Sequence, residues 1–229
     1  GWDTSISQGT GNGDQATVSN STVCGNLNIS QNDLFFNLIG DTALVHNDTV
    51  AGSVSISQGN AGGDTATIDP TTVGGDVTIT QGKGSCDSAS MIGGSVGGDL
   101  LICQGDGDHD SALVQDVASV GGCLTIKQGD GDCDSAIIDP TVVGGDVTIL
   151  QGSGSGDIAI IDSVVALTGN VTITQQDVAG GLGDTAKVLN VITGSVLPGP
   201  YDVFGNVSIT QGDAPGDIAL VDGGSSNNI

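Results

Sequence analysis

The chain repeats one unit nine times, and the copy from Gly74 to Ile92 (GGDVTITQGKGSCDSASMI) shows it most clearly. Every copy contains a glutamine, at Gln8, Gln31, Gln58, Gln81, Gln104, Gln128, Gln151, Gln175 and Gln211. An isoleucine precedes each glutamine by two residues, and an Asp-x-Ala triplet follows it, beginning at Asp14, Asp41, Asp64, Asp87, Asp110, Asp134, Asp157, Asp184 and Asp217. The usual period is 23 or 24 residues, which is typical of repeat architectures such as solenoids.

Each copy contains two strand patterns. Val77 to Gln81 alternates apolar and hydroxyl residues, so Ile79 and Gln81 are expected on the inner face. Asp87 and Ala89 share the inner face of a second strand, after a glycine-rich arc suited to positive φ. A third apolar position stands eight residues before each following glutamine, at Val23, Val50, Val73, Val96, Val120, Val143, Leu167 and Val203.

No hairpin turn signal recurs with the period, so successive copies are expected to coil rather than to meander. The sequence predicts an all-β protein: a parallel β-solenoid of nine coils of about 23 residues, forming one domain over 1–229 with uncapped ends. Like residues should then stack at about 4.8 Å.

Three insertions interrupt the repeat, at 32–40, 176–183 and 189–202. Loops longer than a fold requires often bind partners. Phe35, Phe36 and Tyr201 are therefore candidate partner contacts, because they are among the few aromatic residues of the chain. The alternative is that these loops fold back over the rod.

Composition excludes several classes of protein. There are 27 acidic residues, all aspartate, against three lysines and no arginine, giving a net charge of −24. This charge argues against nucleic acid and is compatible with divalent cations. No apolar run is long enough for membrane insertion. Without arginine or glutamate, and with only two separated histidines, the chain is not expected to be an enzyme.

The order glutamine, glycine, acid and alanine on strand, arc and strand resembles the curli subunit family of bacterial surface amyloid. Ser53 to Gln58 and Asp76 to Gln81 are similar to the first half of that family's repeat, and the Asp-x-Ala triplets to the second half. More loosely, the chain is similar to glycine- and aspartate-rich β-strand-repeat proteins of bacterial surfaces. The resemblance implies an exported subunit of a cross-β-like fibre, locked by inward amide ladders.

The expected unpaired coil ends also favour a fibre subunit, because an open edge strand is a template for pairing. We therefore expect a structural subunit of an extracellular or cell-surface filament, such as a biofilm matrix, whose main partner is itself in a head-to-tail homopolymer. One alternative is the repeat region of a calcium-binding surface adhesin. An ice-binding rod is a more distant one, suggested by outward Ser/Thr pairs such as Thr78 and Thr80.

The arcs of the fifth and sixth copies are rich in aspartate and resemble the calcium-binding nonapeptide of repeats-in-toxin proteins. Their oxygens are candidate ligands for Ca²⁺, which takes six to eight: Asp106, Asp108, Asp110, Asp130, Asp132 and Asp134. The alternative is that these are solvated acids, with the stacked aspartates of the triplets held by backbone amides, protonation or a cation.

The five cysteines show no paired spacing. Cys86, His109 and Cys133 occupy one column, directly before the aspartate of the triplet. Two coils separate the cysteines, about 9.6 Å at the strand spacing, which is too far for a disulfide or for shared zinc ligation. We expect small arc residues there.

Overall fold

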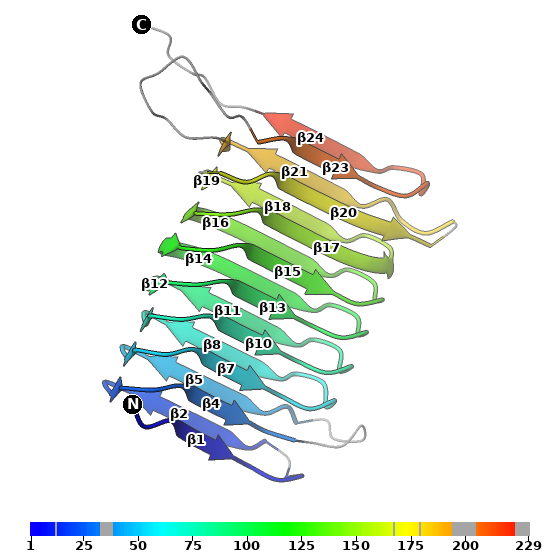
Figure 1. The fold of residues 1–229 in the computed structure, drawn as a ribbon. Coiled ribbons are helices and arrows are strands. Elements are labelled where there is room, and N and C mark those ends of the chain that lie inside the picture. The colour runs from blue at the N-terminus through cyan, green and yellow to red at the C-terminus, as the bar shows by residue number, and fades with distance from the viewer. Residues whose placement is uncertain (12, 33–38, 167, 179, 194–204, 223–229) are drawn as a thin grey trace, which may run out of the picture.

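The structure is a computed structural model that describes residues 1–11, 13–32, 39–166, 168–178, 180–193 and 205–222. Over these residues it contains strands and turns and no helix. The strands stack in parallel into a rod with the first strand, β1, and the last strand, β24, at opposite ends (Figure 1). The predicted parallel β-solenoid is confirmed. Nine stacked strands from the first copy to the last enclose eight full turns.

The first strand of every copy belongs to one nine-stranded sheet. Its members are, in spatial order, β1 (Thr4–Ser7), β4 (Leu27–Ser30), β7 (Val54–Ser57), β10 (Val77–Thr80), β13 (Leu100–Cys103), β15 (Leu124–Gln128), β17 (Val147–Gly154), β20 (Val171–Asp177) and β23 (Val207–Thr210). Equivalent residues pair directly, so Ile79 lies between Ile56 and Ile102. The repeat thus sets the register, because a slip of one residue would turn the isoleucines outward.

The second and third strands of the copies form the other sheet. The second strands are β2 (Gln15–Ser19), β5 (Thr42–His46), β8 (Thr65–Asp69), β11 (Ser88–Ile92), β14 (Ser111–Val120), β16 (Ser135–Val143), β18 (Ile158–Asp162), β21 (Thr185–Leu189) and β24 (Ile218–Asp222). The short third strands are β3 (Thr22–Val23), β6 (Thr49–Val50), β9 (Thr72–Val73), β12 (Ser95–Val96), β19 (Val164–Ala166) and β22 (Ile192–Thr193). In the fifth and sixth copies both strands merge, into β14 and β16, which therefore pair with neighbours at both positions.

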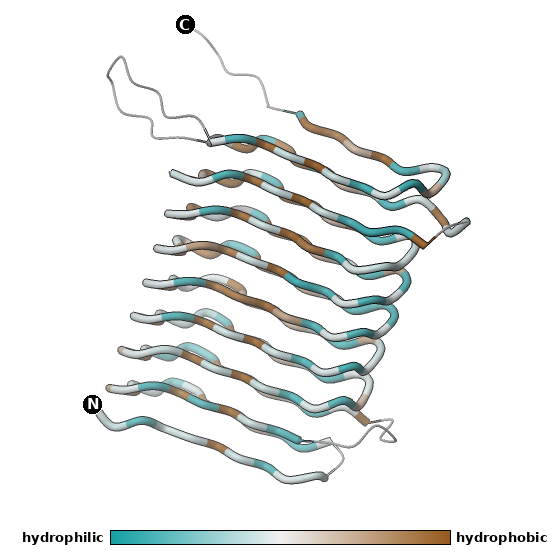
Figure 2. Tube along the Cα trace, turned by 45° about the vertical axis from the view of Figure 1, so that its right-hand side comes forward, coloured by the Kyte–Doolittle hydropathy of each residue, from teal (hydrophilic) through white to brown (hydrophobic). Residues whose placement is uncertain are grey.

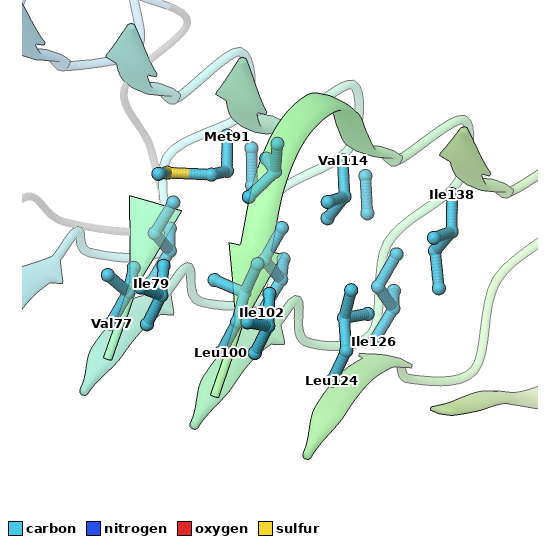
Figure 3. Packing of buried hydrophobic residues seen from close by; sticks show 14 of the residues in the cluster. Val77, Ile79, Met91, Leu100, Ile102, Val114, Leu124, Ile126 and Ile138 are labelled. Atoms are coloured by element: carbon cyan, nitrogen blue, oxygen red, sulfur yellow. The ribbon is translucent and has the colours of Figure 1, made fainter. Parts of the chain in front are cut away.

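The core is a set of apolar columns that runs along the rod axis. Ile79, Ile102 and Ile126 are fully buried in one column, and Met91 stands in the column of Val114 and Ile138 (Figure 3). Figure 2 shows apolar segments recurring at the same place on successive coils. Each fully buried aliphatic side chain contributes about 1.5–3 kcal/mol. Small and aliphatic residues therefore build this thin core without aromatic side chains.

The predicted boundaries need adjustment in two places. Ala166, not Leu167, continues the column of Val143 at the third position, and Leu167 and Val203 lie outside the described residues. The insertion expected at 176–183 begins within a strand, because β20 continues to Asp177 and pairs Gln176 with Ser153 after a register shift. Of the other insertions, residues 33–38 and 194–204 lie outside the described part of the chain.

Positive φ marks the residue before the triplet aspartate in seven of the nine copies, where the arc re-enters the second strand. Glycine occupies the position in several copies, as Gly63 and Gly156 do with φ of 84° and 77°. Cys86, His109 and Cys133 adopt the same left-handed conformation, with φ of 66°, 63° and 63°. A non-glycine residue pays about 1–2 kcal/mol for this region. The backbone conformation thus explains what the column of Cys86, His109 and Cys133 has in common.

Candidate functional site: polar ladders and open coil ends

A continuous amide ladder runs through the interior. The Nε2 of each glutamine donates to the Oε1 of the glutamine one coil earlier, over eight links from Gln31 to Gln211 at 2.8–3.1 Å. Gln81, 2% exposed, also donates to the carbonyl oxygens of Asp64 and Ser88, both at 3.0 Å. Each amide therefore ties its own first strand to its own second strand and to the coil before it.

An aspartate ladder lies beside it and has the opposite polarity. The backbone N–H of each triplet aspartate donates to Oδ1 of the aspartate one coil later, over eight links from Asp14 to Asp217 at 2.7–3.0 Å. Asp87 and Asp110 are both fully buried. Of the three ways considered for holding stacked carboxylates, backbone amide donors are therefore the one the structure shows.

The burial of the second carboxylate oxygen, Oδ2, helps to explain why the pKa values in this column are raised. Oδ2 of Asp110 and of Asp134 is buried without a hydrogen-bond partner. Loss of solvation raises the pKa of Asp110 to about 7, against the lowering effect of the Asp87 N–H, and the Asp134 and Asp108 charges raise it further. Burial raises the pKa of Asp134 and of Asp157 to about 6.

Burial likewise raises the pKa of Asp184 to about 7, with the carboxyl of Asp177 beside it as a further cause. The interior thus favours the protonated form of these carboxyls.

A third ladder was not anticipated from the sequence. Five residues before the glutamine, every copy except the sixth has Asp, Asn or Ser, and the sixth has Cys123. In the first to fifth, seventh and eighth copies this side chain accepts the N–H of the equivalent residue one coil later, as Asp76 does from Asp99 at 2.9 Å and Asn170 does from Asn206 at 2.9 Å. The recurrence of short polar residues at this position was the signal that could have revealed it. Its polarity is opposite to that of the aspartate ladder.

The six candidate calcium ligands are divided between two environments. Asp110 and Asp134 point into the core, whereas Asp106, Asp108, Asp130 and Asp132 are exposed on the arcs. The exposed four also form ladder bonds: Oδ1 of Asp106 accepts from the Asp130 N–H at 3.2 Å, and Oδ1 of Asp108 from the Asp132 N–H at 3.0 Å. Over the part of the chain that the structure describes, no three Asp, Cys or His side chains come together as metal ligands.

The arc charges are partly compensated by one lysine. Lys83 Nζ lies 2.6 Å from Oδ2 of Asp106 on the neighbouring coil. This bond, with the N–H of Asp130, lowers the pKa of Asp106. The structure thus leaves the calcium hypothesis with four outward carboxylates, one of them already bonded to a lysine.

All five cysteines are free thiols. Cys24, Cys86, Cys123 and Cys133 are exposed, and burial raises the pKa of the half-buried Cys103 thiol. The candidate contact residues Phe35, Phe36 and Tyr201 lie outside the described residues.

Both ends of the rod expose residues that are buried elsewhere. β1 and β23 are the edge strands of the first sheet. At the C-terminal end Val207 is 38% and Val221 is 56% exposed, whereas Val171 and Val188, one coil earlier in the same columns, are 0% and 1% exposed. At the N-terminal end Ile6 and Val18 are only partly buried, whereas Ile29 and Val45, one coil later in the same columns, are buried. Over the described residues, edge strands and partly exposed core columns therefore coincide at both ends.

Comparison with known proteins adds no relative. No protein-family model, curated protein or solved structure matches the chain. Among the described residues there is also no helix of the length and apolarity needed to cross a membrane.

Proposed function

We propose that the protein is a structural subunit of an extracellular filament or matrix and that it assembles head to tail through its open coil ends. The observation that carries the proposal is that edge strands and partly exposed core residues occur together in the first and last described coils. A parallel edge with unpaired N–H and C=O groups is satisfied by another strand in the same direction. Because the two ends differ, their contact is heterologous, and because successive rods stack along one axis the assembly extends into a filament.

The sides of the rod support the same function. The net charge of −24 is carried by a chain with only three lysines. Such charge repels the flanks of neighbouring rods and disfavours irregular lateral association. The ends provide apolar surface and hydrogen-bonding capacity that can outweigh this repulsion over one coil. The resemblance of the repeat to curli subunits is in line with an exported fibre protein.

Electron microscopy and X-ray fibre diffraction of the purified chain test the proposal. We expect unbranched filaments that are one rod wide, with a meridional reflection at about 4.8 Å. The experiment is run at neutral and mildly acidic pH, with calcium and with a chelator. A protein that sediments as a monomer at millimolar concentration under all of these conditions would contradict the proposed function.

A further inference from the structure

The three ladders leave complementary groups at the two ends of the rod. The amide ladder runs from each Nε2 to the preceding Oε1, so Gln8 presents a donor at the N-terminal end and Gln211 an acceptor at the C-terminal end. In the aspartate ladder, Asp14 carries the acceptor carboxylate and Asp217 the donating N–H. Each ladder therefore continues with correct polarity if the first coil of one copy follows the last coil of another.

The third ladder and the backbone hydrogen bonds also leave a donor at one end of the rod and a matching acceptor at the other. Asn206 occupies the acceptor position at the C-terminal end, opposite the N–H of Asp3 in a following copy. The N–H at the position of Val207 donates in every earlier coil to the next coil, as Val77 donates to the Asp99 carbonyl at 2.9 Å. Val207 is thus the equivalent donor for the Asp3 carbonyl of a following copy.

We propose that the joint between two copies is a registered stack in which β1 of one copy pairs in parallel with β23 of another, with Gln8 on Gln211 and Ala16 on Ala219. This inference rests on the proposed function and specifies its contact. The occupant of both ends is a second copy of this chain, because the same three ladders meet there with matching donors and acceptors.

One residue does not fit the uninterrupted stack. Six residues before the glutamine, all eight later copies have glycine: Gly25, Gly52, Gly75, Gly98, Gly122, Gly145, Gly169 and Gly205. A Cβ at Gly205 would lie 1.9 Å from the carbonyl oxygen of Gly169, and a Cβ at Gly25 would lie 2.7 Å from that of Trp2. The column therefore excludes side chains wherever a coil lies before it.

The first copy has Trp2 at this position. In a registered joint the Cβ of Trp2 would meet the Gly205 carbonyl of the preceding copy, as Gly205 would meet that of Gly169. Gly1 and Trp2 precede β1 and are not part of the ladder of strands, so the joint closes when these two residues move out of the column while Asp3 keeps its place. Trp2 accordingly acts as a brake on end-to-end assembly, in the way that edge strands are protected elsewhere.

Two variants separate this brake from a role for the indole ring. Trp2→Ala removes the ring but keeps the Cβ that clashes, whereas Trp2→Gly removes both. We expect Trp2→Gly to lower the critical concentration for filament formation by about tenfold, ~1.4 kcal/mol, and Trp2→Ala to behave like the wild type. If both variants changed the critical concentration for filament formation equally, or if neither changed it, the proposed steric role of Trp2 would be overturned.

Proline variants test the polarity of the joint, because proline lacks the edge N–H. In β1 the Thr4 N–H bonds to the second coil, so the N–H of Ser5 faces the open end. Ser5→Pro should block the N-terminal end alone, and Val207→Pro the C-terminal end alone. Each variant by itself is expected to be monomeric, and an equimolar mixture should form dimers and nothing longer in sedimentation velocity.

The outcomes also separate this inference from the proposed function. Filaments of the wild type combined with dimers of either proline variant alone would refute the head-to-tail contact, here and in the proposed function, but would leave the role as a filament subunit standing. Absence of filaments from wild-type protein would refute both. Circular dichroism of each variant checks that the coil remains folded.

Discussion

The backbone N–H of Asp110 donates a 2.9 Å hydrogen bond to Oδ1 of Asp134, one coil further along the rod. The same bond links each triplet aspartate to the next, so the column is held by its own main chain rather than by basic side chains. Only one carboxylate oxygen of Asp110 and of Asp134 is used in this way, and the other is buried without a partner. The column is therefore ordered by hydrogen bonding but costly to ionise.

Stability should decrease as the pH rises from about 4 to about 7. The pKa values of Asp110, Asp134, Asp157 and Asp184 are raised from 3.8 to about 6–7 by burial. The folded state then binds more protons than the unfolded state in this window, so the stability that these groups contribute is fully present below about pH 4 and is lost as the pH rises through their folded pKa values. Urea unfolding at pH 4.5 and at pH 8 checks this, and equal free energies of unfolding would contradict it.

Replacing one buried carboxyl by an amide should remove part of this dependence. Asp134→Asn keeps an Oδ1 that can accept the Asp110 N–H and has no charge to bury. We expect a gain of about 1–3 kcal/mol at pH 8 and little change at pH 4.5. Asp132→Asn is the matched control, because Asp132 is exposed and also accepts a backbone N–H. Equal effects of the two variants at pH 8 would contradict the assignment.

Interrupting the amide ladder should destabilise the rod. Gln128→Met has a similar volume but leaves the Nε2 of Gln151 without its 2.8 Å acceptor and removes three donor contacts. Stranding buried partners costs about 1–3 kcal/mol. Gln115→Met, at an exposed position, should be nearly neutral. Chemical denaturation of both variants at pH 4.5, below the raised pKa values of Asp110, Asp134, Asp157 and Asp184, provides the measurement.

The left-handed column predicts opposite effects for two neighbouring substitutions. Gly156→Ala places a Cβ at φ of 77° and should destabilise the protein by about 1–2 kcal/mol. Cys133→Gly relieves the same strain at φ of 63°. The larger entropy of glycine in the unfolded chain offsets part of this gain, so the variant should be neutral or stabilising. Gly9→Ala is the control, because a Cβ there meets nothing within 4 Å. Thermal melts of the three variants would show the order.

Calcium binding at the arcs has its own test. If stacked Asp106 and Asp130 contribute ligands, calcium should raise the melting temperature, and the double variant Asp106→Asn, Asp130→Asn should abolish the increase. The double variant Asp76→Asn, Asp99→Asn is the control, since these are also exposed, stacked aspartates joined by a ladder bond. An equal calcium response in all three proteins would show that the effect is not located at the arcs.

Most of the buried residues could be predicted, because the repeat places the same residue types at equivalent positions of each copy. Ile79, Gln81, Asp87 and Ala89 have buried equivalents in every copy from the second to the eighth, and alternation with period two assigns such residues to a face. How the stacked carboxylates of the aspartate column are stabilised could not be predicted from the sequence. The choice among amide donors, protonation and a cation depends on the position of the next coil's N–H, and a sequence does not give that distance.

The irregular places needed the structure as well. Counting from the next glutamine selected Leu167, but the chain places Ala166 above Val143, because a corner of one residue more or less still satisfies the strand pairing on both sides. The column of Cys86, His109 and Cys133 could be aligned from the sequence, yet its meaning is a backbone dihedral angle. Likewise, the glycine six residues before each glutamine after the first can be read from the sequence, whereas the clash that requires it cannot.

By itself the sequence determined the fold class, the register and the identity of the inward columns, because a fixed period places equal residues at equal positions. Only the tertiary structure decided the direction of each ladder, the burial of one carboxylate oxygen and the mismatch of Trp2 with the glycine column. Those properties depend on which atoms of adjacent coils come within hydrogen-bonding or van der Waals distance, and they exist only once the coils are stacked.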